Sequence, residues 1–313
     1  MTMTADKVDG NEKTGFRLKL GRTTWHLIAT EGTRDWLARF ARILELKPWP
    51  EKHAGDQMAR RLFFFEGRSG AADRRPGFRS LAAAAGLPPR GWRSLALNPT
   101  LLRTHPDIPD AVLEVRWLNQ RFLDVENMAK SCYVFYESIV AGEGLVLHAA
   151  LLEKNGFGIA LAGSGGAGKS TCARRFPAPW KALCDDTCLI RPDSRGGFRA
   201  HPFATWSDYL WKRAEGTWTV ESHVPLRAVF FLKKAEEDRV QPMGGGEAAI
   251  YLSRSGHEIL SVFLKSMDRN QARSMRQKIF TNACSVSRAV QAFNLEVGPH
   301  GRFWTKVEQA LAG

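Results

Sequence analysis

The stretch Gly163-Ser164-Gly165-Gly166-Ala167-Gly168-Lys169-Ser170 decides the fold, because it matches the pattern G-x-x-x-x-G-K-[ST] at every fixed position. The apolar run Phe157–Ala162 before it has the length of a strand, and the stretch Ser170–Phe176 after it has helical character. Glycines in such a loop let successive backbone N–H groups point inward, so that they form a nest for an anion at the start of a helix. We therefore predict a phosphate-binding loop between a buried strand and a helix.

Residue types within the loop indicate a nucleoside triphosphate with Mg²⁺. Lys169 supplies a point charge to the β- and γ-phosphates, and the Ser170 hydroxyl is a ligand for Mg²⁺. ATP or another nucleoside triphosphate is thus the expected ligand. The predicted nucleotide contacts are Gly163, Ser164, Gly165, Gly166, Ala167, Gly168, Lys169, Ser170 and Thr171.

Two carboxylates follow the next apolar strand, which ends at Cys184. They are Asp185 and Asp186, sixteen and seventeen residues beyond Lys169. Strand ends in α/β sheets open onto the edge that carries the phosphate loop, so both acids are expected to face the triphosphate. One carboxylate can hold Mg²⁺ and the other can take a proton from an attacking hydroxyl. Neighbours on a strand point to opposite faces, which suits two separate tasks. The alternative is a solvated turn at a strand end.

A histidine precedes the loop by one hairpin. The runs Leu145–Leu152 and Phe157–Ala162 flank Asn155-Gly156, a strong signal for a β-hairpin turn. His148 lies on the first of these strands, 21 residues before Lys169. Because the second strand delivers the phosphate loop, His148 is a candidate for the site. The alternative is a hydrogen-bonded histidine of the core.

Length and composition favour a folded protein of two domains. At 313 residues, with 44% hydrophobic and 25% charged residues, bulk disorder is excluded. We predict a disordered tail over residues 1–14, a smaller α+β domain over 15–127 and an α/β domain over 128–313. No secretory signal and no apolar run of about 20 residues occurs, so we expect a cytoplasmic protein without a membrane partner. The cysteines lack C-x-x-C spacing and predict a reducing compartment; they are Cys132, Cys172, Cys184, Cys188 and Cys284.

Hydrophobic periodicity predicts the remaining elements. In the first domain it indicates a hairpin over 16–20 and 23–28, a helix from Thr33 to before Pro48, and strands over 111–118 and 121–125. In the second it indicates a mostly helical stretch over 258–293. Further strands and a final helix are expected over 181–184, 187–190, 198–203, 227–232 and 302–311.

The net charge of +13 indicates an anionic partner. Arg60–Arg103 holds nine arginines, no lysine and two acids, and its Gly, Pro and Ala content predicts mostly loop. These arginines are either solvated, paired with acids elsewhere, or part of a docking surface. A second group, Arg269, Arg273 and Arg276, falls on one helix face. No nucleic-acid-binding module is present, so a peptide is favoured over nucleic acid.

Five stretches in order resemble the HPr serine kinase/phosphorylase superfamily. Within it they are most similar to its peptide-modifying relatives, the kinases of lasso-peptide clusters and the ScmC-type proteins of SynChlorMet cassettes. The resemblance implies a phosphoenolpyruvate-carboxykinase-like P-loop fold and transfer of phosphate from a nucleotide to a serine hydroxyl. The stretches are 147–150, 163–170, 183–186, 200–203 and 225–232.

The same resemblance implies roles for individual residues. Asp185 would be the catalytic base and His148 would orient or assist it. Asp186 and Ser170 would hold Mg²⁺, and Lys169 with the loop amides would stabilise the charge on the transferring phosphoryl group.

The chain also departs from the HPr kinases. Ala149 stands where those enzymes have glycine after the histidine, and their glutamate-arginine-glycine signature has no clear counterpart. Glu215 and Glu221 are the only candidates for a further metal-binding glutamate. The signature for docking HPr is absent, which argues against HPr as the substrate.

The sequence therefore predicts an ATP-dependent kinase that acts on a serine of a peptide or small protein, such as a ribosomally made precursor peptide. Two alternatives stay open. One is a nucleotide-binding scaffold that recruits other enzymes of a modification cassette, and the other is a kinase of free serine. A GTPase is disfavoured because no N-K-x-D sequence occurs. A homo-oligomer is compatible with the sequence.

Overall fold

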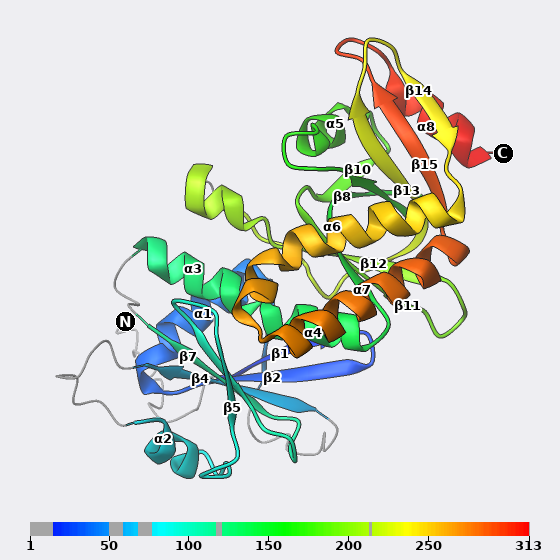
Figure 1. The fold of residues 1–313 in the computed structure, drawn as a ribbon. Helices are drawn as coiled ribbons and strands as arrows, with labels where there is room; N and C mark the ends of the chain where they lie inside the picture. The colour runs from blue at the N-terminus through cyan, green and yellow to red at the C-terminus, as the bar shows by residue number, and fades with distance from the viewer. Residues whose placement is uncertain (1–14, 50–58, 68–76, 117–120, 213–214, 313) are drawn as a thin grey trace, which may run out of the picture.

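Two β-sheets with helices form a mixed α/β protein (Figure 1). The computed structural model describes residues 15–49, 59–67, 77–116, 121–212 and 215–312. The tail predicted over residues 1–14 lies outside this part of the chain. The first sheet and its helices come from the N-terminal third. Four helices lie between it and the second sheet in Figure 1, namely α3 (Arg121–Ser131), α4 (Tyr133–Ala141), α6 (Gly245–Ser266) and α7 (Arg269–Ala289). No helix in the described ranges has the length and apolar character needed to cross a membrane.

The first sheet has seven strands in the order β3-β1-β2-β4-β7-β6-β5. Strands β2, β4 and β7 are parallel and the other pairs are antiparallel. The predicted hairpin is confirmed as β1 and β2, and the predicted helix is confirmed as α1, whose Trp36, Leu37 and Phe40 are buried. The bounds are β1 Gly15–Leu20, β2 Thr23–Ala29, η1 Glu31–Thr33, α1 Arg34–Ile43, β3 Lys47–Trp49, β4 Arg60–Glu66, α2 Phe78–Ala84, β5 Arg93–Ala96, β6 Leu101–Thr104 and β7 Ala111–Val115.

The expectation that Arg60–Arg103 is mostly loop is wrong for the described part of that segment. It contains β4, α2, β5 and β6, and residues 68–76 lie outside the described ranges. Strand β4 is central, between the parallel strands β2 and β7, so its apolar run is buried on both faces. The side chain of Arg61 bonds to Asp110, and that of Arg103 to Glu114. These two arginines are therefore paired with acids, one directly before β7 and one on it.

The strand predicted over 121–125 is also wrong. These residues begin helix α3, Arg121–Ser131. Its buried residues, Asp124, Asn127, Met128 and Ser131, recur at intervals of three and four, which is helical periodicity. Asn127, the predicted domain boundary, lies inside this helix. Its side-chain Oδ1 accepts a hydrogen bond from Thr100.

The second sheet has eight strands, and its two longest strands pair with different neighbours along their length. Strand β8 pairs with β11 over its first residues and with β9 and β10 beyond them. Strand β13 likewise pairs first with β12 and then with β9 and β15. The pairings β8–β11–β12–β13–β9–β8 thus close a ring. The bounds are β8 Leu145–Lys154, β9 Phe157–Ala162, β10 Lys181–Cys184, β11 Thr187–Pro192, β12 Phe198–Phe203, β13 Val224–Lys234, β14 Arg239–Pro242 and β15 Gln291–Val297.

Helices cover both faces of strands β8, β9, β13 and β15. Helices α5 and α8 share one apolar cluster with these strands, and α6 and α7 share another. The helical stretch predicted over 258–293 corresponds to α6 and α7. It begins earlier than expected, at Gly245, and it ends at Ala289 because residues 291–293 belong to β15. The bounds are α5 Lys169–Arg175, η2 Asp208–Lys212, α6 Gly245–Ser266, α7 Arg269–Ala289 and α8 Phe303–Ala312.

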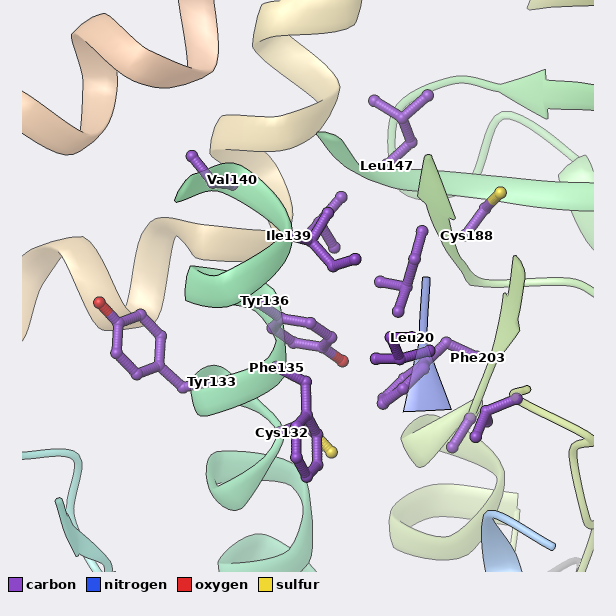
Figure 2. Close-up of a cluster of buried hydrophobic side chains, with 14 of the residues drawn as sticks. Leu20, Cys132, Tyr133, Phe135, Tyr136, Ile139, Val140, Leu147, Cys188 and Phe203 are labelled. Carbon is purple, nitrogen blue, oxygen red and sulfur yellow. The ribbon is translucent and has the colours of Figure 1, made fainter. Parts of the chain in front are cut away.

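Helix α4, Tyr133–Ala141, lies in the apolar core that the two sheets share. Figure 2 shows its Tyr136 and Ile139 pointing toward Leu20 of β1 and Phe203 of β12, while Tyr133 points the opposite way. The ring of Tyr136 packs edge-on against Phe203, with ring centroids 5.4 Å apart. One core therefore spans the residues that the sequence assigns to two domains.

The five cysteines are free thiols. Four of them are buried, including Cys184 and Cys188. Cys284 on α7 is partly accessible.

Candidate functional site

The phosphate loop joins strand β9 to helix α5, which is the strand–loop–helix order that the sequence predicts. Gly168 precedes the helix with φ of +100°, a conformation that L-residues with a side chain rarely adopt. The Lys169 ammonium turns back over the loop and donates hydrogen bonds to the carbonyl oxygens of Gly163 and Ser164, at 2.9 and 3.2 Å. The loop is thus held in a closed turn around a buried lysine.

A cavity of about 710 Å³ opens beside this loop. The structure brings nine of the twelve predicted site residues to its wall, from β8, from the loop and α5, and from the link between β10 and β11. Gly163, Ser164 and Gly165 belong to the start of the loop and do not line the cavity. The predicted residues that line it are His148, Gly166, Ala167, Gly168, Lys169, Ser170, Thr171, Asp185 and Asp186.

The two carboxylates have different partners. They occupy a two-residue bend between β10 and β11, directly after the strand that the sequence predicts before them, so the alternation of neighbours along a strand does not apply to them. The hydroxyl of the buried Thr205 donates to Asp185 Oδ1 at 2.7 Å. Asp186 Oδ1 lies 3.1 Å from His148 Nε2. The bend therefore separates the two acids, as the alternation argument expects, but by a different local geometry.

His148 lies between two carboxylates. Its Nε2 contacts Asp186, and its Nδ1 lies 2.9 Å from Glu258 Oε1 without an aligned hydrogen bond. Burial disfavours the charged imidazole, but the contact with Asp186 and the negative charges of Asp186 and Glu258 outweigh burial and the nearby Lys169, so the pKa of His148 is raised. Its backbone N–H donates to Ser255 Oγ at 3.0 Å.

Glu258 connects this histidine to the phosphate loop. Its Oε1 also accepts a hydrogen bond from the Gly165 N–H at 3.2 Å. Glu258 and Ser255 lie one turn apart on α6, so one helix face fixes both the backbone and the ring of His148. A single carboxylate thus contacts the loop and the histidine.

Sequence reasoning missed Glu258, Ser255 and Thr205. Neither Glu215 nor Glu221, the candidates for a further glutamate, lines the cavity, and Glu221 Oε1 accepts instead from the Lys19 N–H. The only sequence signal for the α6 pair is the i, i+3 spacing of two polar residues, which gains meaning once α6 is placed against β8.

Burial and charge act in opposite directions on Lys169. Burial lowers its pKa, and the negative charges of Glu258, Asp186 and Asp185 oppose that shift. The lysine is therefore surrounded by three carboxylates in a partly dry site. Two of the three N–H groups of its ammonium donate to the loop carbonyls, which leaves one to offer to an anion in the cavity.

The oxygen donors at the cavity fit Mg²⁺. Mg²⁺ prefers oxygen and is held by one or two protein ligands together with phosphates and water. Ser170 and the acids at the β10–β11 bend supply a hydroxyl and carboxylates on the same cavity wall. Within the described ranges no cluster of three His, Cys, Asp or Glu could hold a metal by protein ligands alone. These residues thus suit a metal that arrives with a phosphate ligand.

Comparison with known proteins finds a family match over the part of the chain that forms the cavity wall. The model of the family SynChlorMet cassette protein ScmC matches residues 113–312, nearly two thirds of the chain, and includes every residue of the cavity wall. No curated protein matches the chain. The match confirms the resemblance to ScmC-type proteins, and the chain belongs to the SynChlorMet cassette protein ScmC family.

Proposed function

We propose that this protein is an ATP-dependent kinase that phosphorylates a serine hydroxyl of a peptide or small protein encoded with its cassette. The observation that carries the proposal is one cavity lined by Lys169 and Ser170 of the phosphate loop together with Asp185 and Asp186. The proposal includes a phosphoenolpyruvate-carboxykinase-like P-loop kinase domain built on the second sheet, preceded by a smaller α+β domain.

Asp185 is the proposed base. Thr205 donates to Oδ1, which fixes the carboxylate and leaves Oδ2 to face the serine hydroxyl. The serine oxygen attacks the γ-phosphorus, the bond from that phosphorus to the β,γ-bridging oxygen breaks, and the serine proton passes to Asp185 Oδ2. The products are the phosphoserine peptide and the nucleoside diphosphate.

The loop and the second carboxylate provide the electrostatic part of the reaction. Lys169 holds the β- and γ-phosphate oxygens as charge develops on the bridging oxygen. Ser170 and Asp186 would hold Mg²⁺, which neutralises phosphate charge when bound.

His148 is a positioning residue in this scheme. It contacts Asp186, while Asp185 is held by Thr205, so the histidine acts on the metal-binding carboxylate more directly than on the base. This differs in detail from the assistance to Asp185 that the family resemblance implies.

The test is phosphorylation of a peptide from the same cassette. Protein, Mg-ATP and peptide are incubated, and mass spectrometry is expected to find one added phosphate on a serine. The variant Asp185→Asn keeps the hydrogen-bond partner of Thr205 and removes the basic oxygen, so we expect a loss of transfer of about 100-fold or more with nucleotide binding intact. The control is Asp268→Asn, which retains the N-cap of α7 away from the cavity.

The outcomes separate the competing functions. Full transfer by Asp185→Asn would remove the proposed base. Nucleotide binding by the unaltered protein with no transfer to any cassette peptide would favour the scaffold, and transfer to free serine alone would favour the metabolite kinase.

A further inference from the structure

A second cavity, of about 660 Å³, lies where the two sheets meet. Its wall comes from the β1–β2 turn, the C-terminal end of α4 and the hairpin of β11 and β12. Its charged lining is mostly cationic, with two carboxylates, Asp193 and Glu143. The cationic and imidazole side chains are Arg22, Arg191, Arg195, Arg199 and His223.

Arg191 is held in a fixed orientation at this cavity. Its Nε donates to His201 Nε2 at 2.9 Å and its Nη1 donates to the Pro192 carbonyl at 3.2 Å. The guanidinium also packs on Gly21 (φ +65°), where a Cβ would lie 2.7 Å from Arg191 Cζ. A guanidinium has five N–H groups, so three of them have no partner within the described part of the chain.

His201 is a neutral acceptor for this arginine. Burial, followed by the nearby positive charges of Arg191, His223 and Arg199, lowers the pKa of His201 to about 3, although its contact with the Val220 carbonyl opposes the shift. Its Nδ1 lies 3.1 Å from that carbonyl, which places the proton there and leaves Nε2 to accept. Arg191 is thus oriented without having its charge neutralised.

The positive charge of the cavity exceeds its negative charge. Asp193 pairs with Arg199 at 2.8 Å. Over the described ranges no carboxylate lies within ion-pair distance of Arg191, Arg22 or Arg195. Burial lowers the pKa of Arg191, and repulsion from Arg199 and Arg22 lowers it further. The attraction of Asp193 opposes this shift. An anion in the cavity would relieve this repulsion.

We propose that this cavity is a second anion site, separate from the phosphate loop, that binds the phosphate group of a small phosphorylated molecule. The planar fork of an arginine matches two oxygens of a phosphate, and charge-assisted bonds of this kind are among the strongest in proteins. Arg191 supplies the oriented fork, and Arg22 and Arg195 supply charge from the rim. The site lies between β1–β2 and β11–β12, so its ligand joins the two sheets.

The test is calorimetry with pyrophosphate on the full chain. In the variant Lys169→Ala, which removes the loop lysine, pyrophosphate is expected to bind one remaining site. Adding Arg191→Gln is expected to weaken that binding about tenfold or more, since a hydrogen-bonded charge is lost. Adding Arg273→Gln, an exposed arginine of α7 outside both cavities, is the control and should leave the affinity unchanged.

A second variant protects the test against a folding defect. Arg195 is exposed in the β11–β12 turn, so Arg195→Gln is expected to weaken pyrophosphate binding a few-fold in a folded protein. Pyrophosphate affinity unchanged by both substitutions overturns the proposal, and so does citrate binding as tightly as pyrophosphate, since it indicates a carboxylate site. Arg191→Gln alone should leave phosphate transfer from Mg-ATP to the cassette peptide unchanged, because Arg191 does not line the cavity beside the phosphate loop, so this site and the proposed kinase fail or succeed separately.

Discussion

At the scale of single residues, the site depends on a carboxylate that arrives from a distant part of the chain. Glu258 contacts Gly165, which lies 93 positions earlier, and the ring of His148. The loop glycines, Lys169 and both aspartates could be predicted because their spacing along the chain carries the chemistry. Glu258, Ser255 and Thr205 could not, because only the packing of α6 on β8 and the position of Thr205 just beyond β12 bring them to the cavity.

The first residue-scale prediction concerns Glu258→Gln. The amide oxygen can still accept from the Gly165 N–H, but the negative charge beside His148 is lost. We expect the pKa of His148 to fall relative to the unaltered protein, because Glu258 is one of the charges that raise it. NMR titration of the His148 ring measures this. The matched control is Glu247→Gln, an exposed glutamate in the first turn of the same helix. If the pKa of His148 is the same in Glu258→Gln as in the unaltered protein, the charge of Glu258 does not act on the His148 ring and the prediction is wrong.

The second prediction follows from the direction of the pKa shift of His148. Because the pKa of His148 is raised above 6.5, its protonated form stabilises the folded state, fully below pH 6.5 and less as pH rises through the folded-state value. The stability advantage of the unaltered protein over His148→Asn should therefore shrink as the pH rises above 6.5, the ordinary value from which the pKa of His148 is raised. Urea unfolding at several pH values measures it. A stability difference between the two proteins that widens as the pH rises would contradict the prediction.

At the scale of elements, local patterns predicted those strands and helices whose burial follows one period. The hairpin of β8 and β9 and the helix α1 are of this kind. The sequence does not predict helix α3, because its first five residues taken alone form a short, mostly apolar run between turn residues that is typical of a strand. Its helical periodicity becomes visible only when residues 127–131 are included. The sequence does not predict strand β4, because the segment around it is rich in arginine, glycine and proline and is typical of a loop. The apolar run of β4 itself is typical of a central parallel strand.

The element-scale prediction concerns the turn from β9 into α5. A Cβ at Gly168 would meet nothing within 4 Å, so the penalty of Gly168→Ala comes from φ of +100° alone. We expect a loss of about 1–2 kcal/mol in unfolding free energy, together with weaker nucleotide binding. Gly244→Ala is the control, since that glycine has equal space and φ of −64°. Denaturant unfolding and nucleotide titration measure the two effects, and equal stability of both variants would contradict the argument.

At the scale of the whole molecule, the two sheets share one core through α4. Further hydrogen bonds connect the segment before β13 to the end of α1. The backbone N–H of Trp218 donates to the Ile43 carbonyl. The hydroxyls of Thr217 and Thr219 donate to the Glu45 carboxylate and lower its pKa. The sequence predicts a boundary near Asn127 from a change in element order. It could not predict that helices following the first sheet would fill the space between both sheets.

The whole-molecule prediction is a single unfolding transition. Phe135 is fully buried on α4 and packs edge-on against Trp25 of β2, so Phe135→Ala is expected to destabilise the protein by about 3–5 kcal/mol. Hydrogen exchange should then rise in both sheets together. Phe280→Ala, at an exposed position of α7, should change little. Faster exchange confined to the first sheet would instead indicate that the N-terminal part unfolds on its own.

The distribution of thiols has a practical consequence for such experiments. Burial raises the pKa of Cys132, Cys172, Cys184 and Cys188, so these thiols are poor nucleophiles in the folded protein. Cys284 is the partly accessible member of the set and lines neither cavity. A maleimide dye should therefore attach at one position on α7 without any cysteine being removed, and its fluorescence can then be followed while nucleotide or pyrophosphate is added to test the two proposed sites.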